Sequence, residues 1–441
     1  MKTLIIPCAG GERIDGLPLI LNRHPEDGTI LAAKLLSGIF PESYGRIIYA
    51  VTADMEEKFS VSSAIAQSVP SAEVVVLSEK TSGAADTVCR TIRYAGISGG
   101  IAVKDSHSRI ALSSPIEGNA IAGLDLMQTD IPVANLRSKS FIVLNEQDNV
   151  CDIAEKRLRS DVISAGMYSF RDAEDFVSAF VRLSDPDYPA GRLYVSHIIS
   201  YLVGRRDFVF SCSKAEAFEE WADQTAWQKL RRGHLPASVR LIIADLDGTL
   251  FDTAGVNCAA YSEALERGLD YEYFRAHCNG RHYTDFLPEI VPGISSEAMK
   301  MIHSRKKALY RKYLTLAKPN TGLLALLGMC RGECSLALVT TASRENTQDI
   351  LRAFGLENFF DLVLAHEDIA HSKPDPEGYL KAMQYFGASP EECIIFEDSE
   401  TGLEAARRSG AQYFTVNMTE EVDAMREKMY NFTSHHITSH P

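Results

Sequence analysis

The stretch LIIADLDGTLFDT, residues 241–253, begins as a run of apolar residues and ends in two aspartates that are one residue apart. An apolar run of this kind is typical of a buried strand in a parallel sheet. Like charges at the end of a buried strand are costly unless a cation or a shared proton offsets them. Asp245 and Asp247 are therefore predicted to hold a positive ligand, and Gly248 after them permits a tight turn.

The sequence after this stretch alternates between helical and strand patterns. A helical segment at about 254–318 comes first, and strand patterns follow in CSLALVTTAS, FFDLVLAHED, ECIIFEDS and AQYFTV, with helical segments between them. Ser343 is predicted to cap a helix that Gly355 ends. Because alternating strands and helices indicate parallel βαβ units, the second half is predicted to be an α/β doubly wound parallel sheet with a helical insertion after its first strand.

Polar residues follow several of these strands. In an open parallel sheet, ligands bind where the carboxyl ends of the strands meet. Asp245 and Asp398 offer carboxylates to Mg²⁺, which keeps water and phosphate oxygens as its other ligands. A bound metal and Lys373 would neutralise a phosphate, so one aspartate could attack phosphorus while the other exchanges the proton. The sequence thus predicts a magnesium-dependent phosphoryl-transfer site.

Four motifs stand in order in this half: DLDGT, TTAS, SKPDP and FEDSETGLEAARRSGA. With them, residues 240–416 resemble the haloacid dehalogenase superfamily of phosphohydrolases. The resemblance implies that Asp245 is the nucleophile and that Asp247 is the general acid/base, whose main-chain carbonyl also binds Mg²⁺. The other implied site residues are Thr340 for the phosphoryl group, Lys373 as the cation, Asp398 as a metal ligand and Glu397 in support.

Other polar residues of this half are weaker candidates. Thr341, Asp252 and Ser399 fit supporting hydrogen bonds at least as well as substrate contacts. The insertion at about 254–318 resembles the cap that selects the substrate in this superfamily. Basic residues of the cap that could meet a distal phosphate are Arg281, His282, Lys306, Lys307 and Arg311, the last three fitting a solvated helical face better. Thr341 and Arg281 are retained as predicted substrate-binding residues.

A second strand pattern, TLIIPCAGGER near the N-terminus, also runs into a glycine turn. Such a turn can cradle phosphates with its backbone N–H groups. Gly10, Gly11 and Arg13 resemble the signature loop of nucleotidyltransferases that activate sugar or alcohol phosphates. The loop differs from the usual A-G-x-G-x-R at the first glycine, and GLPLIL lacks the expected lysine. The resemblance covers residues 1–232 and implies a Rossmannoid mixed sheet.

Further segments match the nucleotidyltransferases in order. TSGAADTV, with Gly83, resembles the loop that reads the nucleotide base. The implied metal ligands are Asp105 in GGIAVKDSHSRI and Asp223 in EEWADQTAW. Lys139 and Lys156 are the implied ligands of the sugar-side phosphate. The resemblance thus implies Mg²⁺-dependent transfer of CMP or UMP, from CTP or UTP, to a sugar or polyol phosphate.

The length and composition of the chain indicate how many domains it has and where they meet. The chain of 441 residues is long enough for two or three domains. The segment KLRRGHLPASV is basic, contains glycine and proline, and lacks apolar periodicity, so a boundary is predicted near residue 235. The predicted parts are a nucleotidyltransferase-like domain at 1–235, a phosphatase domain at 236–420 and a tail at 421–441.

The net charge and the cysteine content argue against several classes of protein. A formal net charge of -14 argues against a nucleic-acid or anionic-membrane partner, since either calls for a basic surface. The 9 cysteines are odd in number and scattered, which disfavours a disulfide framework. No apolar segment reaches the ~20 residues of a membrane span. We therefore expect a cytoplasmic protein that acts on small phosphorylated molecules, while its oligomeric state is left open.

Three functional hypotheses follow. The first is a bifunctional enzyme of nucleotide-sugar or surface-glycan synthesis, with nucleotidyl transfer in one half and phosphate monoester hydrolysis in the other. In the second, the N-terminal half binds a nucleotide without catalysis and regulates a phosphatase. The third is a phosphomutase, because an aspartyl-phosphate site under a basic cap can return the phosphoryl group to another oxygen. The sugar, the base and the order of reactions stay open.

Overall fold

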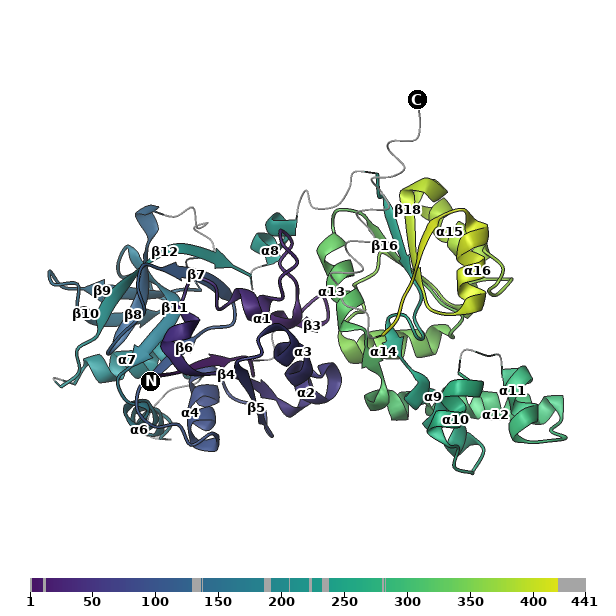
Figure 1. Ribbon diagram of the computed structural model, residues 1–441, viewed down its shortest axis with the longest axis horizontal. Helices are drawn as coiled ribbons and strands as arrows, with labels where there is room; N and C mark the ends of the chain where they lie inside the picture. Colours follow the sequence, from purple (N-terminus) through teal and green to yellow (C-terminus); the bar gives the residue numbers. More distant parts are fainter. Residues whose placement is uncertain are drawn as a thin grey trace. The chain divides into compact units, whose positions relative to one another are not determined.

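A computed structural model describes residues 2–10, 13–128, 136, 138–185, 192–205, 207–221, 224–231, 238–279, 281 and 283–418. The chain divides into two compact units (Figure 1). The first unit comprises Met1–Ile14, Pro18–His24 and Thr29–Trp227. The second unit comprises Asp15–Leu17, Pro25–Gly28 and Gln228–Pro441. Each unit has its own sheet and its own apolar core.

The sheet of the second unit has five strands, all parallel, in the order β17-β16-β13-β18-β19. Its strands are β13 (Leu241–Ala244), β16 (Ser335–Val339), β17 (Leu362–Leu364), β18 (Cys393–Glu397) and β19 (Gln412–Thr415). Strand β13 is fully buried because strands pair with both of its edges and helices cover the sheet. The predicted parallel α/β sheet is confirmed.

Four helices connect these strands: α13 (Thr321–Cys330), α14 (Arg344–Phe354), α15 (Glu377–Phe386) and α16 (Glu400–Ser409). Figure 1 shows α13 and α14 on one face of the sheet and α15 and α16 on the other. Helix α14 has the predicted ends, because the Ser343 side chain accepts a hydrogen bond from the Asn346 N–H and Gly355 adopts φ 72°.

The segment after β13 leaves the sheet and returns to it. Strand β14 (Phe251–Asp252) pairs antiparallel with β15 (Lys318–Pro319), and the helices between them form a layer of their own, the cap (Figure 1). Apolar side chains that include Tyr261, Phe274 and Phe286 form the core of the cap. Its helices are α9 (Ala254–Ala264), α10 (Tyr271–His277), α11 (Tyr283–Ile290), α12 (Ser296–Leu309) and the 3-10 helix η4 (Tyr310–Leu316).

The first unit is built on a 10-stranded mixed sheet with the main order β5-β4-β1-β6-β11-β8-β12-β7. Its strands are β1 (Lys2–Pro7), β4 (Tyr44–Thr52), β5 (Ala72–Leu77), β6 (Ile101–Lys104), β7 (Ser108–Leu112), β8 (Ala120–Asp125), β9 (Ser140–Leu144), β10 (Val150–Glu155), β11 (Val162–Phe170) and β12 (Ser211–Glu220). Strands β1, β4, β5 and β6 are parallel, whereas β11 runs antiparallel to β6.

The helices of this part of the chain are α1 (Leu31–Lys34), α2 (Ala53–Phe59), α3 (Val61–Ser68), α4 (Ala84–Tyr94), α6 (Ala173–Leu183), α7 (Val195–Val203) and α8 (Gln224–Arg231), and a short pair of strands is formed by β2 (Arg13–Ile14) and β3 (Leu17–Pro18). Helices α4, α6 and α7 contribute side chains to an apolar cluster that they share with strands of the mixed sheet. The mixed orientation of the strands agrees with the expected kind of sheet. A nucleotidyltransferase fold stays a prediction.

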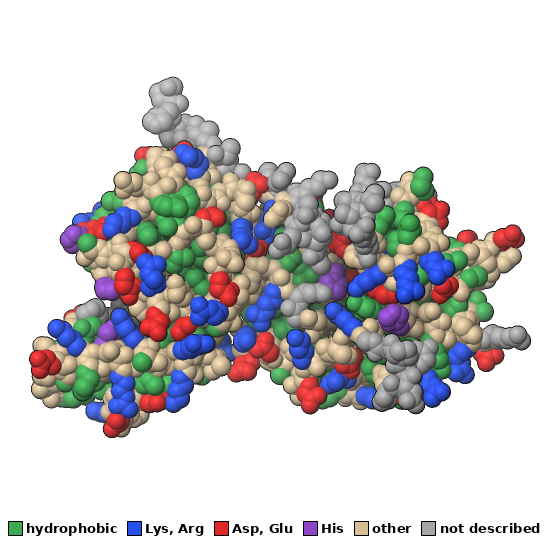
Figure 2. All heavy atoms as spheres, turned by 180° about the vertical axis from the view of Figure 1, so that it is seen from behind, with side chains coloured by type: hydrophobic (Ala, Val, Ile, Leu, Met, Phe, Trp, Pro, Cys, Tyr) green, Lys and Arg blue, Asp and Glu red, His purple; other side chains and the backbone are tan. Residues whose placement is uncertain are grey.

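The surface mixes charges of both signs. On the face drawn in Figure 2, Lys and Arg side chains are interspersed with Asp and Glu side chains. This mixing spreads the charge over the face instead of gathering it in one large basic area. Among the described helices, none combines the length and the apolar character that crossing a bilayer requires.

Candidate functional site

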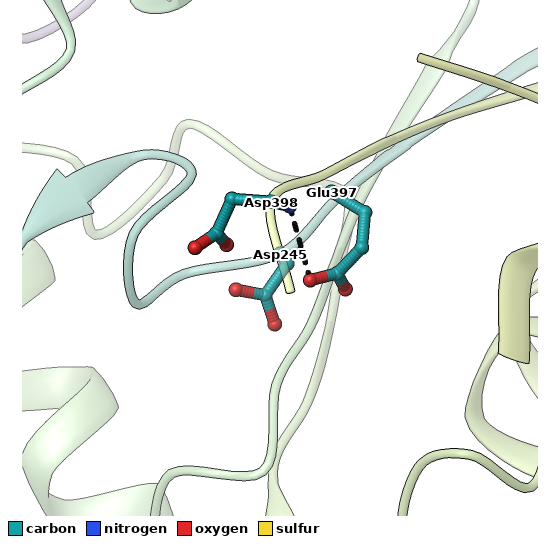
Figure 3. A group of neighbouring side chains, drawn as sticks. All are labelled: Asp245, Glu397 and Asp398. Carbon is teal, nitrogen blue, oxygen red and sulfur yellow. Dashed lines mark hydrogen bonds between the residues drawn. The ribbon is translucent and has the colours of Figure 1, made fainter. Parts of the chain in front are cut away.

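Three carboxylates meet at the carboxyl end of the parallel sheet (Figure 3). Asp245 directly follows the central strand β13, Glu397 ends the neighbouring strand β18, and Asp398 is the next residue. One carboxylate oxygen of each lies within 4.8 Å of the others. The Asp245 N–H donates to the Phe396 carbonyl at 3.0 Å, so the pairing of β13 with β18 extends into the site and fixes the position of Asp245.

Glu397 is fully buried, and hydrogen bonds occupy both of its oxygens. Oε2 accepts from the Lys373 ammonium and the Tyr379 hydroxyl, each at 2.6 Å, and Oε1 accepts from the Ser399 hydroxyl at 2.9 Å. Burial by itself would raise the pKa of Glu397, but Lys373 and the hydrogen-bond donors lower it overall. Glu397 is therefore an ionised anchor for Lys373, and its oxygens are already occupied.

Lys373 links Glu397 to Asp245. Its Nζ lies 2.5 Å from Oδ1 of Asp245 and 2.6 Å from Oε2 of Glu397, and its side chain is only 10% exposed. The ammonium also lies 5.2 Å from the centre of the Tyr379 ring. One ammonium neutralises one carboxylate, so three ionised carboxyl groups would leave two negative charges uncompensated in a buried place.

This excess of negative charge shows in the pKa of both aspartates. Burial, and then the nearby Glu397, raise the pKa of Asp245 well above its ordinary value against the opposing effect of Lys373. Burial raises the pKa of Asp398 to about 6, although a hydrogen bond from Thr249 acts in the other direction. A divalent cation would favour ionisation of both groups. These carboxylates therefore fit a Mg²⁺ ion that would have Asp245 and Asp398 as ligands.

The loop after Asp245 presses its backbone against Asp398. Gly248 has φ +92°, and a Cβ at this position would lie 2.1 Å from Oδ2 of Asp398. Only glycine fits such an approach. Thr249 is buried, and its hydroxyl donates to Oδ1 of Asp398 at 2.8 Å. The glycine and threonine after the two aspartates thus position a carboxylate that is distant in the sequence.

Asp247 lies outside the cluster of three carboxylates. Its Oδ1 accepts a hydrogen bond from the hydroxyl of Thr253, a buried residue at the start of cap helix α9. The Asn257 side chain donates to the same hydroxyl oxygen at 3.3 Å. These contacts hold Asp247 at the entrance of the cap, and its role in proton transfer stays a prediction.

Thr340 stands where strand β16 ends, as predicted, and only 1% of it is exposed. Its N–H donates to the Leu364 carbonyl at 2.9 Å, and its hydroxyl oxygen accepts from the Ala342 N–H at 3.0 Å. A hydroxyl that already accepts still has its proton to donate to a phosphoryl oxygen. Thr341 is exposed and lines a small cavity together with Lys373.

Lys306 of cap helix α12 contradicts its predicted place on a solvated face. It is only 8% exposed, and its ammonium lies 5.5 Å and 4.9 Å from the ring centres of Tyr261 and Tyr310. Burial lowers the pKa of Lys306 to about 8, although the charge of Asp247 opposes this effect. The prediction is wrong because the long stem of lysine packs on aromatic rings that a helical charge pattern cannot reveal.

Two other predicted cap residues, Arg281 and Arg311, lie at the surface. Arg281 is exposed and donates to both carboxylate oxygens of Glu289, at 2.7 Å and 3.0 Å, so its guanidinium is paired within the cap. Arg311 is exposed and Lys307 is half-buried. His282 lies outside the described residues. Among the predicted cap cations, Lys306 is therefore the candidate ligand of the substrate, because it is buried and because the charge of Asp247 affects its pKa.

Three other residues predicted for the N-terminal half, Arg13, Gly83 and Gly10, each have different surroundings. Arg13 pairs with Asp54 at 3.3 Å and lies over the Phe59 ring at 4.9 Å, and Gly83 is the N-cap of α4. Gly10 is exposed, and a Cβ there would meet nothing within 4 Å. The other two predicted residues, Gly11 and Asp223, lie outside the described residues.

Three predicted residues of the first unit, Asp105, Lys139 and Lys156, line one cavity of about 530 Å³. Asp105 follows strand β6 directly, as predicted, but its carboxylate is ion-paired with Lys104. Lys139 is ion-paired with Glu220. The structure thus gathers these residues around one space, and two of them already have partners of opposite charge.

Comparisons with known proteins concern the second unit. Residues 242–416 match the family model of haloacid dehalogenase-like hydrolases. A phosphorylated carbohydrates phosphatase of Thermotoga maritima is 29% identical over 196 residues, which are 42% of this chain and 89% of that protein. The fructose-1-phosphate phosphatase YqaB of Escherichia coli is 27% identical over 180 residues, 40% of this chain and 96% of that protein. The pyrophosphatase PpaX of Bacillus velezensis is 30% identical over 218 residues, 45% of this chain and 96% of that protein.

Proposed function

The C-terminal half of this chain belongs to the haloacid dehalogenase-like hydrolases, and from this we propose that it hydrolyses small phosphorylated carbohydrates through a phosphoryl group carried on Asp245. The observation that carries the proposal is the buried Asp245 carboxylate, 2.5 Å from the Lys373 ammonium and close to Asp398. A carboxylate so placed can act as a nucleophile toward phosphorus. The names of two relatives, which refer to phosphorylated carbohydrates and fructose 1-phosphate, support the substrate class.

In this proposal Asp245 attacks the phosphorus atom of the substrate. A bond forms between a carboxylate oxygen and phosphorus while the bond from phosphorus to the alcohol oxygen breaks. Water then attacks phosphorus, and inorganic phosphate and the free carboxylate are released. Lys373 holds Oδ1 of Asp245, so the second oxygen is available for the attack. Mg²⁺ bound by Asp245 and Asp398 would neutralise charge on the phosphate oxygens.

Two side chains around Asp245 are proposed to move or donate protons. Asp247 gives a proton to the leaving alcohol oxygen and later takes one from the attacking water. The hydrogen bond from Thr253 keeps this carboxyl group beside the cap. The Thr340 hydroxyl, whose oxygen already accepts from the Ala342 N–H, donates to a phosphoryl oxygen.

Specificity is proposed to come from the cap. Lys306 and the two tyrosines beside it combine a cation with aromatic and hydroxyl groups, and such groups suit the hydroxylated body of a sugar or polyol. The negative charge of Asp247 opposes the lowering of the Lys306 pKa, so the two side chains interact electrostatically. Lys306 is therefore assigned as a ligand of the substrate outside its transferred phosphate.

The phosphatase proposal is tested with a panel of sugar and polyol phosphates in Mg²⁺, with release of inorganic phosphate as the readout. Asp245→Asn keeps the shape of the side chain but removes the nucleophile, and we expect turnover to fall by at least about 10³-fold. Asp270→Asn, in the N-cap of cap helix α10, is the matched control and should keep wild-type turnover. Equal turnover of wild type and Asp245→Asn would overturn the proposal.

A phosphomutase is the second candidate, and the buried cap lysine favours it. A phosphoryl group on Asp245 can pass to another oxygen of the substrate if the cap retains the dephosphorylated intermediate, which Lys306 could do. A mutase would be activated by a sugar bisphosphate and would release little inorganic phosphate. Separate measurement of isomerised product and of phosphate distinguishes the two activities.

Nucleotidyl transfer by the first unit stays a prediction from the resemblance of residues 1–232. It is supported by the placement of Asp105, Lys139 and Lys156 around one cavity. The assay is release of pyrophosphate from CTP or UTP in the presence of sugar and polyol phosphates. Absence of release across the panel would leave the first unit as a binding module.

A further inference from the structure

A short piece from the start of the chain belongs to the second unit. Asp15–Leu17 lies within that unit, although Ile14 before it and Pro18 after it belong to the first unit. Asp15 and Gly16 are the two turn residues of the hairpin formed by β2 and β3, and both have positive φ, 53° and 79°. An Asp-Gly pair is a common sequence for such a two-residue turn. We call Asp15–Leu17 the hairpin tip.

The carboxylate of Asp15 pairs with two arginines of the second unit. Oδ1 accepts a hydrogen bond from Arg331 at 2.8 Å, and Oδ2 accepts one from Arg231. The side chains of Asp15 and Arg231 are each only 4% exposed. Loss of one member of a buried ion pair leaves an uncompensated charge, which is strongly unfavourable. A buried and directional contact therefore holds the hairpin tip in the second unit.

The hairpin tip packs against the carboxyl ends of helices α13 and α14. A Cβ at Gly16 would lie 3.1 Å from the carbonyl oxygen of Phe354, the last residue of α14. A Cβ at Gly328, in the last turn of α13, would lie 3.3 Å from Oδ2 of Asp15. Arg331, which pairs with Asp15, is the C-cap of α13. Both helices thus end at the hairpin tip.

The amino ends of the same two helices carry groups of the phosphatase site. Asn320, the N-cap of α13, donates through Nδ2 to the Thr249 carbonyl at 3.1 Å, and the Thr249 hydroxyl donates to Oδ1 of Asp398 at 2.8 Å. Helix α14 begins directly after its N-cap Ser343, which follows Thr340 closely in the sequence. Helices of 10 and 11 residues are about 15–17 Å long. Each helix therefore joins the hairpin tip to a loop of the site.

Helix α13 depends on its two ends for its exact placement. The residues from Leu323 to Cys330 are all buried, and each of them is apolar or glycine. Apolar contacts are non-directional, so they specify the axial position and rotation of a helix less sharply than charge-assisted hydrogen bonds do. Loss of the Asp15 contact removes a directional bond from the carboxyl end of α13. The helix can then shift and carry the Thr249 loop with it.

We propose that Asp15 is a positioning residue of the phosphatase site and that it acts through α13 and α14 on the loops that carry Thr249 and Thr340. This inference rests on the proposed function of the second unit. It gives a residue near the start of the chain a part in orienting Asp398 toward Mg²⁺, without a contact of its own to metal or substrate.

The first test measures Mn²⁺ affinity by electron paramagnetic resonance, in the full chain and without substrate. Asp15→Asn is compared with wild type, because asparagine keeps the shape of the side chain and tolerates a positive φ while the charge is removed. We expect the affinity to fall by roughly 3- to 30-fold, as coupling through a packed network predicts. Since no turnover is involved, this result is independent of the phosphate ester that the enzyme hydrolyses.

The second test measures turnover of the best sugar phosphate of the panel. In Asp15→Asn, kcat should fall and the Mg²⁺ concentration for half-maximal activity should rise, each by roughly 3- to 30-fold. KM at saturating Mg²⁺ should stay within about twofold, because the cap is proposed to hold the sugar. Failure of the proposed function appears separately, as equal turnover of wild type and Asp245→Asn.

Glu392→Gln is the matched control. Glu392 also pairs with an arginine, Arg240 at 3.2 Å, but it lies beside the starts of β13 and β18, at the opposite end of these strands from the site. This variant should keep the Mn²⁺ affinity and the kcat of wild type. Arg331→Gln breaks the Asp15 contact from its more exposed side, 39% exposed, and should reproduce the effect of Asp15→Asn. It decides the question if Asp15→Asn does not fold.

Unchanged Mn²⁺ affinity in folded Asp15→Asn and Arg331→Gln would overturn the proposal. A lower Tm without a change in Mn²⁺ affinity would show that Asp15 has a structural role alone. An equal loss of Mn²⁺ affinity in Glu392→Gln would also overturn it, because the loss would then report general destabilisation of the second unit.

Discussion

Replacing the buried cap lysine by methionine should stabilise the second unit and impair its activity at the same time. Lys306 is 8% exposed, and its stem packs between Tyr261 and Tyr310. Methionine has a similar length and no charge, so Lys306→Met keeps most of the packing while removing the buried ammonium. Protein stability and substrate binding then respond in opposite directions, because burial of the charge opposes folding and the charge itself is proposed to contact substrate.

The size of the stabilisation follows from the pKa of Lys306. A fall from 10.5 to about 8 means that the charged form is destabilised by about 3 kcal/mol in the folded state. Below pH 8 the lysine is charged in both the folded and the unfolded state, so this penalty is present in full. Between pH 8 and 10.5 the folded state loses its proton first, so the penalty shrinks as pH rises. The gain from Lys306→Met is therefore largest near neutral pH.

The assay compares thermal unfolding of wild type and variant from pH 7 to pH 10.5. A gain of about 3 kcal/mol corresponds to a rise in Tm of roughly 6–12 °C for a unit of this size. Lys300→Met, at an exposed position of the same helix, is the matched control and should change Tm little at any pH. We expect kcat/KM of Lys306→Met to fall by roughly 10- to 100-fold, as loss of a hydrogen bond from a charged group predicts.

Two results would refute the reasoning about Lys306. A lower Tm for Lys306→Met at pH 7 would show that the ammonium stabilises the folded cap. A Tm gain that stays constant up to pH 10.5 would show that the lysine keeps its ordinary pKa. Wild-type kcat/KM in the variant would remove Lys306 from the substrate site while leaving its effect on stability intact.

Three further predictions concern the carboxylate cluster. Gly248→Ala should weaken Mg²⁺ binding and lower Tm, because its Cβ would overlap Asp398, whereas Gly355→Ala, with a similar positive φ but open space, should lower Tm without changing Mg²⁺ affinity. Thr249→Val removes a donor that lowers the pKa of Asp398, so the acid limb of the kcat/KM profile should move to higher pH; an unchanged limb would contradict this assignment. Glu397→Gln leaves the buried ammonium of Lys373 with one negative partner fewer. The free energy of unfolding should therefore fall by about 3 kcal/mol, which a lower Tm reports. An unchanged Tm would contradict the role of Glu397 as an anchor for Lys373.

The strand ends of the second unit could be predicted because local sequence encodes them. Asp245, Thr340 and Asp398 each stand directly after, or one residue beyond, an apolar run, and parallel strands bring such positions to one edge. The predicted cap of helix α14 at Ser343 was equally local, since it needs only a hydroxyl before the first turn. Features that depend on neighbours within a few residues were therefore within reach of the sequence.

Features that depend on packing between distant segments were out of reach. The burial of Lys306 requires the rings of Tyr261 and Tyr310, and no helical pattern encodes the face that they cover. The pairing of Lys104 with Asp105 joins adjacent residues, but the close approach of Gly166, which lies on another strand, to the Asp105 carboxylate depends on the tertiary structure. An acidic residue at the end of a strand pattern therefore predicts where the carboxylate lies, but not which residue pairs with it.

The two short cap helices illustrate a further limit. Helix α10 spans 7 residues and α11 spans 8, so each has about two turns in which an apolar period can repeat. Pro288 lies inside α11, where a proline normally indicates the end of a helix. Tertiary packing in the cap core, with Phe274 and Phe286, stabilises both helices.

The most direct test of the central claim is to trap the phosphoryl group during turnover. The enzyme is mixed with Mg²⁺ and an excess of its best sugar phosphate, quenched and treated with borohydride, which reduces an aspartyl phosphate to homoserine. Peptide mass spectrometry should then find the reduced residue at position 245 in wild type and nowhere in Asp245→Asn. Turnover without any modified aspartate, or with the modification on another residue, would contradict the account.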